Sequence, residues 1–181
     1  IPPEGYAEYV CALIQTVKQK AEELSLDLPY LLIEPGRSII GEAGVTLYTV
    51  GAIKDIPGVK KYVAVDGGMF ENPRYALYQS QYTPVLASDM RKENSQVVTI
   101  AGKCCESGDL IAANVALPDV QSGDILAILS TGAYNYSMAM NYNRNKIPPA
   151  VLVKDGKAEY IIKPQMYEDI ARNDVVPERL R

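Results

Sequence analysis

The feature of this sequence that most constrains its fold is a change of pattern near residue 43. Beyond that point, short β-branched and aromatic runs are separated by turn residues, including Pro57-Gly58, Asp66-Gly67-Gly68, Ser122-Gly123 and Asp155-Gly156. The pattern is typical of an antiparallel all-β module, because tight turns return a chain beside the strand it has just left. We therefore predict a mainly β fold, a barrel or sandwich, with strands at residues 45–53, 61–65, 96–101, 109–115, 124–129, 150–153 and 160–163.

The segment before this module has a different periodicity. Apolar residues at Val10, Leu13, Ile14 and Val17 have the three-to-four spacing of an amphipathic helix, which we predict over residues 6–24. The apolar run 30–33 predicts a buried strand that ends in a polar loop. The sequence thus predicts a helix–strand segment at residues 1–42 and a β domain at residues 43–181.

Two stretches interrupt the β pattern. Residues 72–79 and 135–142 are compatible with short helices and are expected to cover the barrel or to face a partner, and residues 167–170 are expected to start a helical turn. Tyrosine is also unusually frequent, with 13 Tyr against one Phe and no Trp. Its excess predicts polar aromatic surfaces at an interface or pocket, although ordinary core packing is an equally good interpretation for most positions.

Composition excludes several classes of protein. The chain has a formal net charge of -4 and no apolar run approaching the roughly 20 residues of a membrane-spanning helix, so we predict neither a nucleic-acid nor a membrane partner. Its three cysteines are an odd number, and adjacent Cys104 and Cys105 are poorly placed to bridge each other, which favours a reducing, cytoplasmic location. Because the sequence opens Ile1-Pro2-Pro3 without an initiator methionine, we expect a fragment of a longer protein.

Histidine is absent, which excludes a serine–histidine triad and most zinc sites built from this chain alone, and we predict no metal site. Any chemistry must use other side chains. The most informative candidate is the run Cys104-Cys105-Glu106-Ser107-Gly108-Asp109, where a thiol adjoins a carboxylate. A neighbouring negative charge hinders thiolate formation, so such a cysteine is better suited to giving up a proton than to nucleophilic attack.

Several motifs together resemble the diaminopimelate decarboxylase family of pyridoxal-phosphate enzymes. They are Glu34-Pro35-Gly36-Arg37-Ser38, Val65-Asp66-Gly67-Gly68-Met69, the run Arg74 to Tyr78, Cys105-Glu106-Ser107-Gly108-Asp109, Gly132-Ala133-Tyr134 and the run Ser137 to Asn143. The match covers nearly the whole chain. It implies a Greek-key-like C-terminal β-barrel domain of an alanine-racemase-like (fold-type III) decarboxylase, preceded by the last helix and strand of a β/α barrel.

The resemblance also implies an activity. It is the decarboxylation of meso-2,6-diaminopimelate to L-lysine and carbon dioxide, the last step of lysine biosynthesis, with pyridoxal 5'-phosphate as cofactor. The family's Schiff-base lysine and glycine-rich phosphate loop match nothing in this sequence, so the chain alone is expected to be inactive. The resemblance further implies an obligate homodimer, in which the Cys-Glu loop reaches the active site of the neighbouring subunit.

Residue roles follow from the resemblance and from side-chain chemistry. Glu34, Gly36, Arg37 and Tyr134 are the predicted cofactor-binding residues, and Arg37, Arg74, Tyr78, Glu106 and Tyr134 the predicted substrate-binding residues. The planar fork of an arginine suits a carboxylate, so Arg37 and Arg74 are assigned to the distal carboxylate of the substrate and Glu106 to its distal ammonium. Cys105 is the predicted catalytic proton donor.

Plainer interpretations stay open at each position. Arg37 could form a surface salt bridge after a strand, Arg74 could be an ordinary exposed arginine, and Tyr78 and Tyr134 could simply pack. For the whole protein, two alternatives remain: a decarboxylase of another amino acid, such as arginine, ornithine or carboxynorspermidine, and a non-enzymatic β-barrel interaction module.

Overall fold

The computed structural model describes residues 5–181, and their contacts separate them into two units with a boundary between Pro35 and Gly36. Residues 1–4, which include the Ile1-Pro2-Pro3 start, lie outside the described part. Helices α2 (Arg37–Ile40) and η1 (Gly41–Ala43) belong to the second unit together with all the strands.

The first unit confirms the predicted helix but not the predicted strand. Helix α1 runs from Tyr6 to Glu23, and the Glu8 carboxylate caps its start by accepting a hydrogen bond from the Gly5 amide at 3.1 Å. Residues 30–33 form no strand, and Tyr30 and Leu32 are 101% and 91% exposed. A strand needs a neighbour to pair with, and the described part of this unit offers only a helix.

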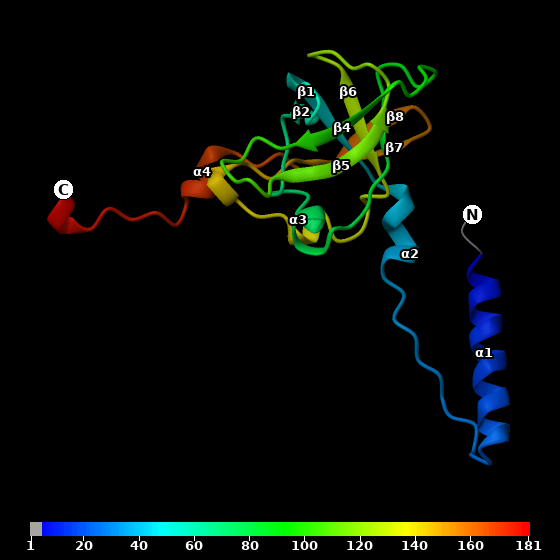
Figure 1. Cartoon of the computed structure of the whole chain (residues 1–181). Coiled ribbons are helices and arrows are strands. Elements are labelled where there is room, and N and C mark those ends of the chain that lie inside the picture. The colour runs from blue at the N-terminus through cyan, green and yellow to red at the C-terminus, as the bar shows by residue number, and fades with distance from the viewer. Residues whose placement is uncertain (1–4) are drawn as a thin grey trace. The chain divides into compact units, whose positions relative to one another are not determined.

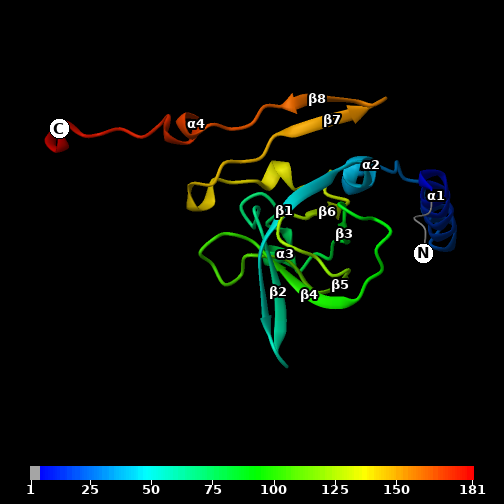
Figure 2. The ribbon, with the colours of Figure 1, turned by 90° about the horizontal axis from the view of Figure 1, so that it is seen from above.

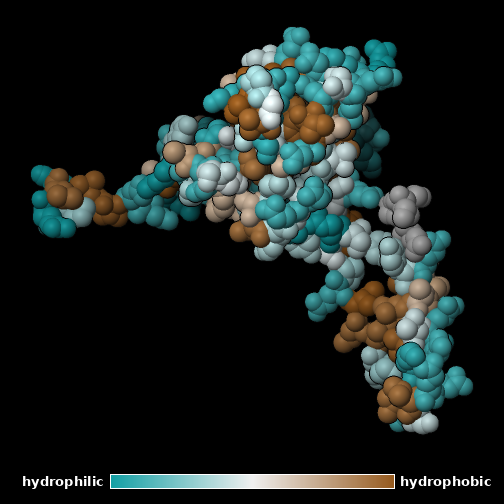
Figure 3. Space-filling view, viewed as in Figure 1, coloured by the Kyte–Doolittle hydropathy of each residue, from teal (hydrophilic) through white to brown (hydrophobic). Residues whose placement is uncertain are grey.

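This unit therefore exposes many apolar side chains. Figure 3 shows them gathered along the segment that follows α1, and they are Leu24, Leu26, Leu28, Tyr30, Leu31, Leu32 and Ile33.

The second unit is built on a six-stranded sheet that nearly closes into a barrel (Figures 1 and 2). Its strands run in the spatial order β3-β6-β1-β2-β4-β5, and the edge strands β3 and β5 lie against each other. The strands are β1 (Val45–Ile56), β2 (Lys60–Val65), β3 (Pro84–Leu86), β4 (Gln96–Ala101), β5 (Leu110–Leu117) and β6 (Ile125–Leu129). The barrel prediction is confirmed.

Two details of the sheet differ from the sequence-based prediction. Strands β2 and β4 pair in parallel, with Tyr62 opposite Thr99, so the module is not wholly antiparallel. The long connection between them carries α3 (Arg74–Tyr78) and β3, and such a crossover is what a parallel pair requires. Strand β3 was not predicted, because it has only three residues and begins with Pro84.

The core of the second unit fills the interior of this barrel. Val63, Ile100, Ile111, Leu117, Leu126 and Ile128 are each 0% exposed. In β2, Val63 and Val65 alternate with more accessible neighbours, whereas β4 and β6 each bury three successive residues. Alternation with a period of two puts one face of a strand inside, so short runs from distant parts of the sequence build one core.

A separate hairpin and several short helices complete the unit. Strands β7 (Ala150–Lys154) and β8 (Lys157–Ile162) pair with each other alone, and Figure 2 shows them apart from the six-stranded sheet. Their turn has positive φ at both Asp155 and Gly156, the geometry that matches strand twist. The remaining helices are η2 (Tyr136–Met138), η3 (Tyr142–Arg144), α4 (Tyr167–Ala171) and η4 (Glu178–Leu180). Among residues 5–181, no helix has the length and apolarity to cross a membrane.

Candidate active site

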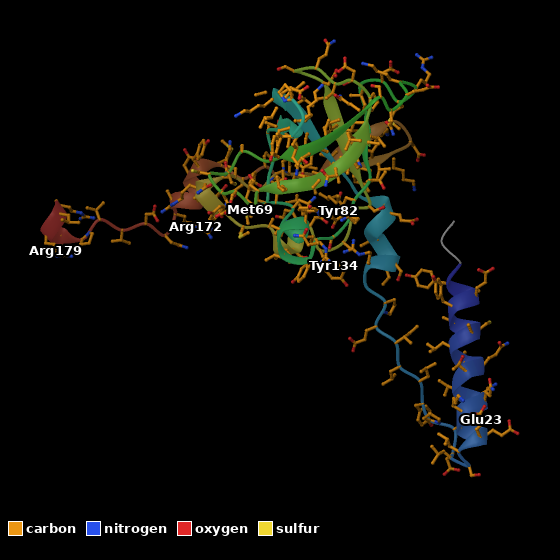
Figure 4. The ribbon with its side chains drawn as sticks, viewed as in Figure 1. Glu23, Met69, Tyr82, Tyr134, Arg172 and Arg179 are labelled. Carbon is orange, nitrogen blue, oxygen red and sulfur yellow. The ribbon has the colours of Figure 1, made fainter. Side chains whose placement is uncertain are left out.

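Four of the predicted site residues come together as a stack of arginines and tyrosines, which we call the arginine cluster: Arg37, Arg74, Tyr78 and Tyr134. The guanidinium groups of Arg37 and Arg74 each lie 5.4 Å from the centre of the Tyr134 ring. Arg74 also lies 5.0 Å from the centre of the Tyr78 ring. Figure 4 shows Tyr134 near α3, the helix that carries Arg74 and Tyr78. These distances are those of cation–π contacts.

Local backbone geometry aims Tyr134 at the arginines. Tyr134 has a φ of 66°, a left-handed conformation that is uncommon for an aromatic residue and therefore needs support from its surroundings. Its hydroxyl occupies the space beside Gly36 where any other residue would place a Cβ, so only glycine fits at that position. Gly36 thus allows the close approach of Tyr134 to the start of α2.

The segments that carry Arg37 and Tyr134 are also fastened together. The Thr131 amide donates to the Gly44 carbonyl at 2.9 Å, and the Gly132 amide donates to the Gly41 carbonyl at 3.0 Å. The hydroxyl of Thr46 at the start of β1 donates to that of Thr131 at 2.8 Å. These hydrogen bonds hold the segments of Arg37 and Tyr134 beside each other and beside the start of β1.

The arginines of this cluster lack a counter-charge. Within the described part of the chain, neither Arg37 nor Arg74 has a carboxylate within salt-bridge distance. Among residues 5–181, the Nε atom of Arg74 is buried without a hydrogen-bond partner, and its Nη1 contacts only the Met138 sulfur, at 3.8 Å. A buried guanidinium nitrogen without an acceptor is costly, so the arrangement fits an anionic group such as a carboxylate or phosphate.

A pocket of about 310 Å³ opens beside both arginines. Its other lining residues are polar side chains and one tyrosine that the sequence did not single out: Ser80, Gln81, Tyr82, Thr83 and Ser130. The only signal available in the sequence was position, since residues 80–83 begin two residues after Tyr78 and Ser130 directly precedes Thr131-Gly132. A second pocket of about 340 Å³ lies along β3 and β5, and none of the predicted site residues lines it.

The predicted Cys-Glu motif forms a tight turn, residues 104–109, which we call the cysteine loop. The side chains of Cys105 and Glu106 are exposed, whereas the backbone is well bonded. The Cys105 amide donates to the Asn143 side-chain oxygen at 3.1 Å, and the Glu106 carboxylate accepts bonds from Ser107 and from the Gly108 amide. The reactive groups are thus presented outward on a fixed turn.

The neighbouring cysteine is a different kind of group. Partial burial and the nearby Asp109 carboxylate raise the pKa of Cys104 to about 11, and the Asn145 side chain approaches its sulfur at 3.6 Å. At neutral pH, Cys104 is therefore an unreactive thiol, in keeping with a packing role. A cysteine on an amphipathic helix is expected to be a small buried residue, but Cys11 on α1 is unpaired and exposed, so this expectation is wrong.

The arginine cluster and the cysteine loop share no polar or ring contact within the described residues. Within residues 5–181, no hydrogen bond, ion pair or ring contact joins Cys105 or Glu106 to Arg37, Arg74 or Tyr134. Glu34, the remaining predicted site residue, belongs to the first unit and is exposed.

A buried carboxyl group lies under the turn that leads into α3. Glu71 is 5% exposed and accepts hydrogen bonds from the Tyr48 hydroxyl at 2.6 Å and from the Gly68 amide at 3.0 Å. Burial raises the pKa of Glu71 to about 7, even though both hydrogen bonds favour the ionised form. No sequence pattern indicates this pair, because Tyr48 and Glu71 are 23 residues apart in the chain.

Comparison with known proteins shows the family to which the chain belongs. Residues 9–132 match the family model described as the C-terminal sheet domain of pyridoxal-dependent decarboxylases. The chain is 51% identical over 173 residues to the diaminopimelate decarboxylase of Bacillus subtilis (strain 168), covering 96% of this chain and 39% of that protein. The crystal structure of diaminopimelate decarboxylase from M. jannaschii superposes with a TM-score of 0.82 at 37% identity, covering 94% of this chain and 38% of that one.

A second crystal structure of the M. jannaschii enzyme, in complex with L-lysine, gives a TM-score of 0.81 at 36% identity, covering 93% of this chain and 38% of that one. The chain thus spans about two fifths of the length of the relatives it matches. Both the family model and these relatives assign it to one family: the chain belongs to the pyridoxal-dependent decarboxylases and contains their C-terminal sheet domain.

Proposed function

We propose that this chain is part of a diaminopimelate decarboxylase, which converts meso-2,6-diaminopimelate to L-lysine and carbon dioxide. The observation that carries the proposal is the arginine cluster, where two guanidinium groups flank Tyr134 without a carboxylate partner in the described chain. Diaminopimelate differs from ornithine in carrying a second carboxylate at its far end, and a pair of free arginines is suited to bind it.

The residues of this chain fit the cofactor that the family uses. Arg37, Gly36 and Tyr134 lie together, and the orphan Nε of Arg74 marks a place where an acceptor oxygen is needed. In our proposal, Gly36, Arg37 and Tyr134 hold pyridoxal phosphate, and Arg37 also shares the substrate carboxylate with Arg74. When bound, the cofactor accepts the electron pair released as the carboxylate leaves.

The chain's own residues then orient the substrate and manage a proton. Arg37 and Arg74 bind the distal carboxylate, Tyr78 and Tyr134 pack around it, and Glu106 accepts hydrogen bonds from the distal ammonium. As the bond between the α-carbon and its carboxylate breaks and carbon dioxide departs, the Cys105 thiol gives its proton to that carbon. Water then returns a proton to the thiolate, so the residue is restored for the next turnover.

We further propose that the site is shared between two copies of the protein. The cysteine loop and the arginine cluster carry complementary groups but have no contact within the described chain. A homodimer in which each loop serves the neighbouring cluster would bring them together. Unpaired cysteines at three positions favour a reducing compartment such as the cytoplasm.

A substrate panel tests this function. The full-length protein, loaded with pyridoxal phosphate, is assayed for carbon dioxide release from diaminopimelate, ornithine, arginine and carboxynorspermidine. We expect diaminopimelate to be preferred by kcat/KM, with L-lysine as the product. Preference for another amino acid would show that the protein is a decarboxylase of that amino acid. If no substrate released carbon dioxide, a non-enzymatic binding module would be favoured instead.

A further inference from the structure

The cysteine loop is held in place by two polar side chains to which no role has yet been given. The Asp109 carboxylate accepts a hydrogen bond from the Met69 amide at 2.5 Å and another from the Cys104 amide at 2.6 Å. Asn143, on the segment after Tyr142, accepts from the Cys105 amide at 3.1 Å. Between them, these side chains fix consecutive amides at the start of the loop.

The Asp109 carboxylate is buried between two glycines, Gly68 and Gly102. Asp109 is 3% exposed, and a Cβ at either Gly68 or Gly102 would collide with its carboxylate oxygens. No ion pair to Asp109 occurs within the described residues, so backbone amides are what satisfy it. Burying a charged carboxylate costs free energy, and hydrogen bonds to it offset this cost. The two bonds of Asp109 also join two separate segments of the chain.

The two segments that Asp109 joins are the ones that carry proposed substrate groups. Met69 belongs to the turn that leads into α3, which bears Arg74 and Tyr78, and Figure 4 places Met69 in this part of the second unit. Cys104 begins the loop that bears Cys105 and Glu106. The Lys103 amide also donates to the Gly67 carbonyl at 3.0 Å, so backbone and side chain reinforce the same junction.

Asn143 is suited to its position by its backbone. Its φ of 52° lies in the left-handed region, which asparagine tolerates better than most residues, and its side chain is thereby turned toward the cysteine loop. Asn145, two residues later, contacts the Cys104 sulfur at 3.6 Å. The segment 143–145 thus supports the loop from a second direction.

We propose that Asp109 and Asn143 are positioning residues: they hold the cysteine loop so that Glu106 and Cys105 meet the substrate at a fixed place. The inference rests on the proposed function for its consequence in catalysis, whereas the anchoring itself is a property of the loop. Neither side chain needs to touch the substrate.

Kinetics of the full-length holoenzyme test the catalytic consequence. In Asp109→Asn, one oxygen becomes an amide that cannot accept, so a backbone amide loses its partner. In Asn143→Gly, the acceptor is lost but the left-handed backbone is retained without strain. Each variant should raise KM for diaminopimelate about tenfold, the cost of one charge-assisted or buried hydrogen bond. The matched control is Asp124→Asn, which changes a carboxylate that accepts from the Gln121 amide in a turn away from the loop.

A double-mutant cycle separates positioning from general destabilisation. If the anchors act through Glu106, the rise in KM should disappear when Asp109→Asn or Asn143→Gly is made in a Glu106→Gln background. An unchanged KM, or an equal rise in both backgrounds, would overturn the proposal. If Asp109→Asn does not fold, the same cycle with Asn143→Gly decides, since Asn143 is exposed.

Hydrogen exchange provides a readout that needs no activity. Both variants should exchange the amides of residues 104–106 at least tenfold faster than the unmodified full-length protein, while the strands of the barrel keep their protection. If the protein proves inactive on diaminopimelate, the proposed function fails, but faster exchange confined to the loop would still support the anchoring. Exchange at the unmodified rate would refute it whatever the activity.

Discussion

The arginine cluster and the cysteine loop are built in opposite ways. In the cluster, the side chains are half-buried or stacked, and the cations have no counter-charge within the described residues. In the loop, the backbone is anchored by Asp109 and Asn143, whereas the side chains of Cys105 and Glu106 point outward. Each part has the charge that the other lacks, and together they match a ligand that carries both a carboxylate and an ammonium group.

The difference also indicates which part is responsible for which property. A stacked cation without a partner supplies binding energy to an anion that enters, so changes in the cluster should lower affinity most. An exposed acid on a rigid turn supplies selectivity with less binding energy, because water competes for it. We therefore expect changes in the cluster to lower activity more than changes in the loop.

Arg74→Met should have the largest effect. In the full-length enzyme, we expect kcat/KM for diaminopimelate to fall on the order of 1000-fold, because a desolvated charge pair loses one partner. Arg74→Lys should recover only part of the loss, since an ammonium cannot form two parallel bonds with a carboxylate. The control is Arg91→Met, at an exposed position. A fall in kcat/KM of less than about tenfold would show that the cluster does not bind the substrate.

Glu106→Gln should have a smaller and more selective effect. We expect KM for diaminopimelate to rise roughly 30-fold with kcat little changed, because the distal ammonium loses a charged acceptor. Steady-state kinetics beside Glu159→Gln, an exposed acid on β8, provide the comparison. An unaltered KM would mean that Glu106 does not bind the distal ammonium group of the substrate.

Glu71→Gln should affect stability and leave substrate affinity unchanged. The Glu71 carboxylate bonds the Tyr48 hydroxyl and the Gly68 amide, neither of which belongs to a proposed substrate-binding residue. Its pKa is raised from 4.5 to about 7, so the folded protein binds this proton more tightly than the unfolded chain. The resulting stabilisation is present below pH 4.5 and is lost as the pH rises through 7.

Thermal unfolding midpoints of the two full-length proteins should reveal this difference. The unmodified protein should gain about 1–3 kcal/mol relative to Glu71→Gln between pH 8 and pH 5. A constant difference across this range would show that Glu71 does not titrate as its burial requires.

Much of the fold could be read from the sequence because it depends on local patterns. The alternation of β1 or β2 and the Asp155-Gly156 turn are properties of short segments. The parallel pairing of β2 with β4 and the short edge strand β3 depend on contacts between distant segments, which alternation does not encode. The strand expected at 30–33 failed for a related reason, since an apolar run forms a strand only where a neighbour exists.

The site shows the same division. Arg37, Arg74, Tyr78 and Tyr134 were predicted as site residues, and their roles stay predictions. Both arginines contact the Tyr134 ring, and Arg74 also contacts the Tyr78 ring. Ser130, the buried Glu71 and the anchor Asn143 could not be predicted, because their importance comes from neighbours more than 20 residues away. Chemistry carried by a motif is readable from sequence, whereas support from a distant segment is not.

The most direct test of the central claim mixes two inactive variants of the full-length protein, Arg74→Met and Cys105→Ala. If each cysteine loop serves the arginine cluster of its partner, a mixed dimer contains one doubly altered site and one intact site. Random exchange of subunits should then restore about a quarter of the unmodified activity on diaminopimelate, while each variant alone keeps its cofactor absorbance. Activity no greater than the average of the two parents would contradict a shared site and with it the proposed pairing of loop and cluster.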